Sequence, residues 1–340
     1  MVAATTLTLL IPGLLGPLPA AAKRWEALTA ARPALTTWLA RARAESARRP
    51  HYYALLDALF ARTPEGPLPA AALGLVGEGA EPAPQGVWLR ADPVHLRADR
   101  DRVMLFAPPR IALDQTEAAS LVAECNRFLA QDGLALRALA PQRWYLGGSA
   151  HTHLEAAPLC AVNGRYIDDY LPRGADARRW LALLTELQML LHGAGANMTR
   201  ESEGRASINS VWLWGEGELP REVRGAWTEV YADEPVLRGL ARLSGARVEA
   251  LPPRLPATGG AALVCLLSCQ EALQADDLEQ WLSSVDALER DWLAPALERL
   301  RGGELDVLSL RCEVGGWRLR RGDLRRFWRR PGPLLKYLEF

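Results

Sequence analysis

The sequence lacks an excess of charge of either sign, and it lacks any long apolar segment. Its 340 residues include 40 basic and 40 acidic ones, so the net charge is zero and the sequence pI is near 7.0. This balance gives no general attraction to nucleic acid or to an anionic membrane surface. It also makes repulsion between copies weak, so an oligomer is a reasonable expectation. No apolar run is long enough to cross a bilayer.

The apolar run from Leu7 to Leu15 lacks the basic residues that precede the core of a signal peptide. Pro12 and Gly13 interrupt it, so it predicts a first buried strand that ends in a turn. Cysteine is sparse, odd in number and spread along the chain: Cys125, Cys160, Cys265, Cys269 and Cys312. We expect reduced thiols in a cytoplasmic protein.

Histidine is equally scarce. The five histidines are His51, His95, His151, His153 and His192, and none lies in the last 148 residues of the 340. The sequence also contains no P-loop, GxSxG, HExxH or dinucleotide-binding motif. No common cofactor is therefore predicted.

Short apolar strand candidates alternate with helical periodicity through much of the chain. The strand candidates are residues 6–11, 210–214, 228–231, 246–248, 261–267 and 305–312. The intervening helices include residues 176–191 and the long amphipathic segment 277–300. Such alternation predicts an α/β core with a mainly parallel sheet and helices on both faces.

The middle of the chain has a different pattern. Residues 62–86 are rich in proline and glycine and predict a loop region. Residues 87–106 predict a hairpin, residues 115–130 a helix, and two short strands follow around Leu134 and Trp144. We therefore predict a discontinuous core, residues 1–82 and 171–340, and a small inserted α+β domain, residues 86–168.

The segment from Tyr170 to Pro220 carries a specific set of spaced residues. It contains YLPRG, then a long helical stretch, then NMTRESEGR and NSVWLWGEG. The pattern resembles that of the archaeal-type cofactor-independent phosphoglycerate mutases, of the alkaline phosphatase superfamily. The residues in register are Leu171, Pro172, Gly174, His192, Arg200, Gly204, Asn209, Trp212, Leu213, Trp214, Gly215 and Gly217.

Weaker similarities extend the resemblance outward. WLRADPVHL resembles the strand that opens the family's inserted domain, with Arg90 at its arginine and Asp92 replacing its asparagine. Within the family the chain resembles the bacterial proteins called regulatory protein RpfE, and the resemblance defines no biochemical role for them. It implies an alkaline-phosphatase-like fold for the core.

The chemistry that the resemblance implies needs a serine nucleophile and two divalent metals held by Asp and His. Here the family's first Asp-Gly aligns with Pro12 and Gly13, and its nucleophile aligns with Leu68, followed by Pro69. The segment LVCLLSCQEALQADD replaces a histidine-rich motif and contains no histidine, and Arg311 and Cys312 replace the last ligands. We therefore predict no catalytic residues and no resident metal.

Four residues remain candidates for an anion pocket: Arg90, Arg200, Arg205 and Asn209. The resemblance places Arg200 and Arg205 near the substrate's phosphate, and guanidinium groups suit bidentate recognition of oxyanions. The alternative is that these arginines pair with nearby glutamates such as Glu201 and Glu203.

Two other clusters have a functional and a structural interpretation. His151 and His153, with Glu155, are weak candidates for a single metal site, and the alternative is a polar loop. The C-terminal run RRGDLRRFWRRPGPLLKY suits an acidic partner or nucleic acid, but it also suits a helix whose arginine stems lie along the surface. We favour the helix.

The sequence thus favours a degenerate, non-catalytic member of this family with a regulatory role, binding a protein or a small anionic or phosphorylated ligand. The alternative is an enzyme that acts on a phosphorylated metabolite by an altered mechanism. Fold alone does not decide between them.

Overall fold

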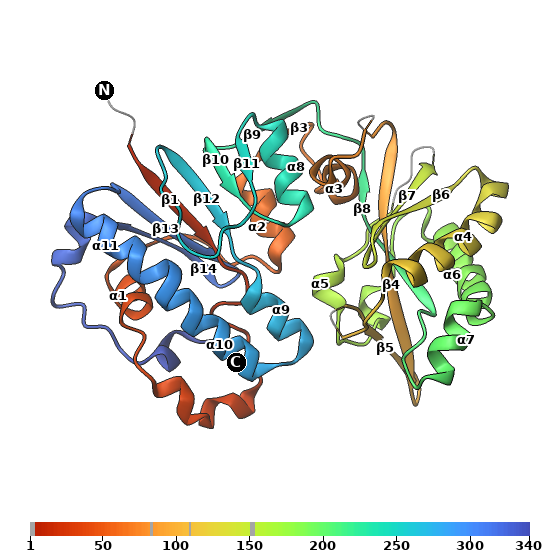
Figure 1. Ribbon diagram of the computed structural model, residues 1–340, viewed down its shortest axis with the longest axis horizontal. Helices are drawn as coiled ribbons and strands as arrows, with labels where there is room; N and C mark the ends of the chain where they lie inside the picture. The colour runs from red at the N-terminus through yellow and green to blue at the C-terminus, as the bar shows by residue number, and fades with distance from the viewer. Residues whose placement is uncertain (1–3, 82–83, 109, 150–153) are drawn as a thin grey trace. The chain divides into compact units, whose positions relative to one another are not determined.

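The structure is a computed structural model that describes residues 4–81, 84–108, 110–149 and 154–340. The chain forms two compact units (Figure 1). Unit 1 contains residues 1–61, 224–234 and 241–340, and unit 2 contains residues 62–223 and 235–240. No helix among the described residues is long and apolar enough to span a membrane.

Unit 1 is built on a seven-stranded sheet with the strand order β11-β10-β12-β1-β13-β14-β2. The pairings from β11 through β13 are parallel, and β14 and β2 extend one edge in antiparallel fashion. The mainly parallel sheet is therefore confirmed. The strands are β1 Thr6–Leu10, β2 Arg43–Ser46, β10 Glu229–Tyr231, β11 Arg247–Glu249, β12 Ala261–Cys265, β13 Val307–Cys312 and β14 Gly315–Arg320.

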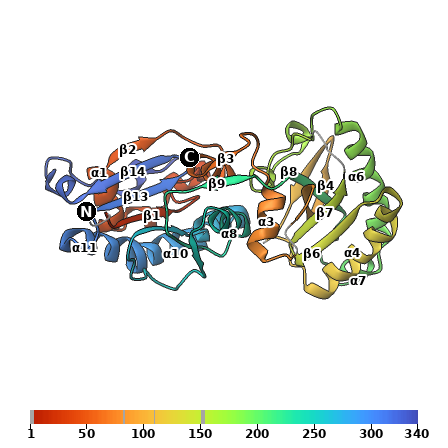
Figure 2. The ribbon, with the colours of Figure 1, turned by 90° about the horizontal axis from the view of Figure 1, so that it is seen from above.

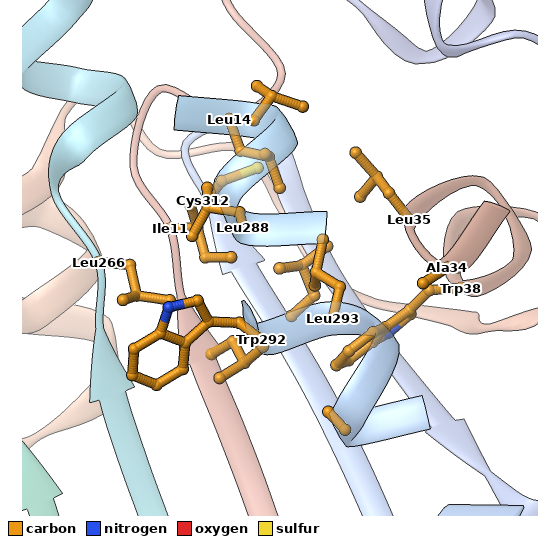
Figure 3. Close-up of a cluster of buried hydrophobic side chains, with 14 of the residues drawn as sticks. Ile11, Leu14, Ala34, Leu35, Trp38, Leu266, Leu288, Trp292, Leu293 and Cys312 are labelled. Atoms are coloured by element: carbon orange, nitrogen blue, oxygen red, sulfur yellow. The ribbon is translucent and has the colours of Figure 1, made fainter. Parts of the chain in front are cut away.

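Helices cover both faces of this sheet. Leu7 and Leu9 of β1 belong to a buried cluster with α1, α10 and α11, part of which Figure 3 shows. Thr8 lies between them in the strand, so its side chain points to the opposite face, where it accepts a hydrogen bond from Trp227 at 3.2 Å. The helices are α1 Pro33–Arg41, α2 Tyr52–Leu59, α8 Pro235–Leu243, α9 Ser268–Ala275, α10 Leu278–Leu288 and α11 Ala294–Gly302.

A five-residue π-helical segment, Glu289–Leu293, joins α10 to α11 within the predicted long helix. It positions the carboxylate of Glu289, which accepts hydrogen bonds from the backbone of Ala34 at 2.6 Å and Leu35 at 2.9 Å. These amides lie at the start of α1, where backbone N–H groups have no partner within the helix and favour a negative charge. Pro33 is the first residue of α1, a position where the missing backbone N–H of proline costs no helical hydrogen bond.

Unit 2 contains an antiparallel sheet of order β5-β4-β7-β6, with β8 also paired to β4. Its strands are β4 Val87–Asp99, β5 Arg102–Phe106, β6 Ala135–Ala140, β7 Arg143–Ser149 and β8 Ser210–Gly217. Helices α4 and α6 share one hydrophobic cluster with the sheet, and α3 contacts β4 and β8. The helices are α3 Ala70–Glu78, α4 Gln115–Leu129, α5 Leu159–Val162, α6 Ala177–His192 and α7 Gly195–Ser202.

A two-stranded pair, β3 Ala61–Thr63 and β9 Glu222–Arg224, lies where the chain passes between the units.

The boundaries of the two units differ from the predicted domain boundaries. Residues 210–217, expected in the parallel core, form β8 and pair with β4 in the sheet of unit 2. Residues 62–82 were also expected in the core, as a loop region, but they contain α3 and belong to unit 2. The physical reason is burial: Ala71 and Leu75 of α3 pack on Tyr145 of this sheet.

The C-terminal run does not form the predicted helix. Residues 321–325 make one 3-10 turn, and the chain then runs without regular structure to Pro333. Pro331 and Pro333 lack the backbone N–H that a helix requires, which explains why the helical pattern fails there.

Two glycines let α3 approach α8 at backbone distance within unit 2. A Cβ atom on Gly239 would overlap the carbonyl of Leu73, and one on Gly77 would overlap the carbonyl of Pro235. We expect Gly239→Ala to lower the free energy of unfolding by about 1–3 kcal/mol, because the two backbones must separate. Urea unfolding followed by circular dichroism measures this.

Gly195→Ala is the matched control. Gly195 lies at the start of α7, and a Cβ atom there meets nothing within 4 Å. That substitution should be neutral or stabilising, because alanine loses less entropy than glycine on entering a helix. Equal effects of the two substitutions would contradict the close approach of α3 and α8.

Candidate functional site

The carboxyl edge of the parallel sheet in unit 1 is the candidate site. In open α/β sheets, ligands bind outside the carboxyl ends of the strands. Leu10 of β1 pairs with Cys265 of β12 on one side and with Arg311 of β13 on the other. The three segments that the sequence aligns with metal-binding motifs therefore meet at this one edge.

The first of these segments is a tight turn that packs on its neighbours. Gly13 has a positive φ of 73°, and a Cβ there would lie 2.8 Å from the backbone nitrogen of Gln270. Its N–H donates to Glu313 at 2.9 Å, and its carbonyl accepts from the indole of Trp281 at 2.8 Å. The turn is held by polar contacts within unit 1.

Thiols occupy the other two segments. Cys265, Cys269 and Cys312 are buried, and burial raises the pKa of each of them, that of Cys312 to about 12. Figure 3 places Cys312 beside Ile11 and Leu288 in the hydrophobic cluster. Because the thiolate is both the nucleophile and the metal ligand, these protonated thiols are suited to packing.

The carboxyl groups near this edge are also shifted toward their neutral forms. Burial raises the pKa of Glu313, and burial together with the charge of Asp233 raises that of Glu271. Tyr52 donates to Glu234 at 3.1 Å and lies 3.6 Å from the sulfur of Cys265; burial raises its pKa well above the usual value. The polar side chains at this edge are thus hydrogen-bonded or ion-paired within unit 1.

The residues present do not fit a two-metal centre. Across the described ranges, no group of three or more His, Cys, Asp or Glu side chains is arranged to hold a metal ion. Histidine and carboxylate are the ligands that divalent metals need for phosphoryl chemistry. Leu68, the residue aligned with the nucleophile, stands just before α3 in unit 2 and carries no nucleophilic group.

Arg200 and Arg205, two of the anion-pocket candidates, share a carboxylate in unit 2. Arg200 is 1% exposed and lies 2.8 Å from Glu117, while Arg205 lies 2.7 Å from the other oxygen of the same carboxylate. Arg205 also contacts Glu203 at 2.6 Å. Both arginines are therefore paired with glutamate, as in the alternative that the sequence left open. Their shared partner, Glu117, is remote in sequence from both.

Arg90, the third arginine, lies in a different buried network. Its guanidinium contacts Asp92 at 2.6 Å and lies over the rings of Tyr145 and Trp214 at 4.9 and 5.3 Å. The indole of Trp214 donates to the other oxygen of Asp92 at 2.7 Å. This network joins strands β4, β7 and β8 and has the features of a packed polar core.

Asn209 is engaged with the backbone. Its side-chain amide accepts from the N–H of Leu96 at 2.7 Å and donates to the carbonyl of the same residue at 2.8 Å. The structure thus shows a hydrogen-bonded partner for each of the four candidates, and Arg90 belongs to a different network from Arg200 and Arg205. The metal candidates His151 and His153 lie outside the described residues.

The chain is similar to enzymes named 2,3-bisphosphoglycerate-independent phosphoglycerate mutase. It is 27% identical over 188 residues to that of Methanosarcina acetivorans, a match that covers 51% of this chain and 46% of the relative. It is 29% identical over 166 residues to that of Methanothrix thermoacetophila, covering 42% of each. The matches thus span less than half the length of these relatives.

One solved structure with a related name is the cofactor-independent phosphoglycerate mutase of Thermoplasma acidophilum. It aligns with 94% of this chain and 89% of its own, with 17% identity and a TM-score of 0.39. No protein-family model matches the chain.

The shared carboxylate of Glu117 gives a direct test of the arginine pairing. We expect Glu117→Gln to lower the free energy of unfolding by about 3 kcal/mol, because it leaves the buried Arg200 without a charged partner. Glutamine keeps the volume and the capping contact at the start of α4, so the charge is the main change. Thermal or urea unfolding measures the loss.

The matched control is Glu203→Gln, which removes the exposed partner of Arg205. Exposed ion pairs contribute about 1 kcal/mol or less, so this variant should remain close to wild type. If the two variants were equally stable, the ion pair between Arg200 and Glu117 would not contribute to stability. Arg200 would then again be a candidate for binding an external anion.

Proposed function

We propose that the protein is a non-catalytic relative of the cofactor-independent phosphoglycerate mutases, with an alkaline-phosphatase-like core, that acts by binding a protein partner. The observation that carries the proposal is the carboxyl edge of unit 1. There the three segments aligned with metal-binding motifs meet, and the aligned ligand positions carry a proline and buried, protonated thiols, beside Arg311, which is paired with Glu45.

The proposal rests on what phosphoryl transfer requires. Two metals polarise the phosphoryl group, activate the nucleophile and stabilise the leaving oxygen. Loss of the nucleophile and of the ligands together removes the mechanism itself. Pro12 and Cys312 offer no hard oxygen or imidazole ligand at the positions where the resemblance places them.

A protein partner is favoured over a small anion. Each of the three candidate arginines already has a carboxylate within 2.8 Å: Asp92 for Arg90, and Glu117 for Arg200 and Arg205. An anion entering there would have to displace an internal carboxylate. The resemblance to the RpfE proteins supports a regulatory role, and the five free cysteines support a reducing, cytoplasmic setting.

The purified chain should show no phosphoglycerate mutase turnover and no p-nitrophenyl phosphate hydrolysis above the blank. The assay is made with added Mn²⁺, Mg²⁺ or Zn²⁺, with the Methanosarcina acetivorans mutase as the positive control. Saturable, metal-dependent turnover that chelation abolishes would overturn the proposal. It would favour the alternative, an enzyme acting on a phosphorylated metabolite by an altered mechanism.

A further inference from the structure

The chain that follows β14 concentrates positive charge on unit 1. Between Val314 and Leu338 the sole acidic residue is Asp323. The basic residues of the same segment are Arg318, Arg320, Arg321, Arg325, Arg326, Arg329, Arg330 and Lys336. This segment therefore carries a net positive charge, although Arg318 is paired with Glu45 and Arg326 with Asp323.

Two large aromatic side chains are exposed within this segment. Phe327 is 77% exposed and Trp328 is 66% exposed, and their rings form an edge-to-face pair with centroids 5.3 Å apart. Adjacent exposed aromatics are unusual on a surface that binds nothing, and such residues are enriched where proteins bind one another.

The segment is fixed in place by contacts to the preceding part of unit 1. Arg326 donates to the carbonyl of Arg41 at 3.2 Å and pairs with Asp323 at 2.8 Å. Arg329 donates to the carbonyl of Ala42, also at 3.2 Å. The aromatic pair is thus presented by an ordered surface anchored to the end of α1.

These contacts border an open groove of about 690 Å³, which we call the β2 groove. Apolar atoms of Leu39, Ala42 and Trp317 line it together with three arginines. The full lining is Leu39, Ala42, Arg43, Ala44, Trp317, Arg326 and Arg329. Its volume suits a short stretch of an extended peptide.

Strand β2 forms one side of the groove and is the last strand of its sheet, beside β14 (Figure 2). Arg43 and Ala44 in this strand are exposed. An edge strand offers backbone N–H and C=O groups to an added strand, and pockets beside it select alternate side chains.

We propose that the β2 groove and the adjacent Phe327–Trp328 pair bind an extended acidic segment of a protein partner. Carboxylates would meet Arg325 and Arg330, which are exposed and have no ion-pair partner in the described part of the chain. Alternating apolar side chains would enter the groove against Trp317. A protein is favoured over nucleic acid because the chain has zero net charge and the groove combines an apolar lining with an edge strand.

This inference rests on the proposed protein-binding role and assigns it a surface, but it uses other residues than those that argue against catalysis. The groove is lined by residues of α1, β2, β14 and the chain after β14, whereas the candidate site is formed by the turns after β1, β12 and β13. Metal-dependent turnover would overturn the proposed function and leave this inference intact, and failure of the binding test would do the reverse.

The test is fluorescence anisotropy of a labelled peptide of about ten residues, in which glutamate alternates with valine or leucine. The full chain should bind it, with affinity falling as salt rises. The double variant R325E/R330E should bind at least about tenfold more weakly, since two contacts become repulsive. The variant F327A/W328A should also weaken binding about tenfold. Hydrogen exchange should show protection of β2 on binding.

Controls separate this surface from charge in general. R24E/R254E makes the same change in charge at two exposed arginines outside the groove lining, and it should bind as wild type does. A peptide with glutamine in place of glutamate should not bind. Unfolding curves check that each variant is folded.

Three results would overturn the proposal. The first is absence of peptide binding by the folded chain. The second is equal weakening by R325E/R330E and R24E/R254E. The third is tighter binding of an oligo-dT of similar length, lost in R325E/R330E, which would assign the surface to nucleic acid.

Discussion

The parallel pairing of β1 between β12 and β13 is the constraint on which the rest of unit 1 depends. It aligns Leu10 with Cys265 and with Arg311, so the turns after all three strands open at one edge. Alternate residues of β1 are buried on the two faces, which fixes this register. The chemistry of the edge then follows from the few residues after each strand, and in this chain they include a Pro-Gly turn and buried thiols.

Local patterns in the sequence predict the elements whose structure is determined locally. The strand Thr6–Leu10, the hairpin of β4 and β5 and the helix α4, with its Asp114–Glu117 capping box, all follow from periodicity and turn residues. Helix α3 lies in a segment whose proline and glycine favour a loop, and β2 is a four-residue strand in a stretch rich in alanine and arginine. Tertiary packing therefore determines both elements. The pairing of β8 with β4 joins residues more than one hundred positions apart, which periodicity does not encode.

The side-chain pairs likewise include some that the local sequence predicts and some that only the fold determines. Arg90 and Asp92 are two apart on one strand, so their pairing is readable from spacing alone. Glu117 is 83 residues from Arg200, and nothing in the local sequence identifies it as the shared partner. Glu203, the neighbour that the sequence suggests, does contact Arg205, but it leaves the buried Arg200 to the remote carboxylate. Because that carboxylate occupies both guanidinium groups, the positions that suggest phosphate binding serve to hold α4 and α7 together.

In this account, the carboxyl edge of the sheet in unit 1 is a packed surface that holds no metal centre. The most direct test is the metal content and metal affinity of the purified full chain, measured by elemental analysis and by titration with Mn²⁺. The account predicts that no stoichiometric divalent metal is retained and that calorimetry shows no saturable Mn²⁺ binding. Two bound metal ions per chain would contradict it, because the chain would then hold a metal centre that the thiols and the Pro-Gly turn at the carboxyl edge do not provide.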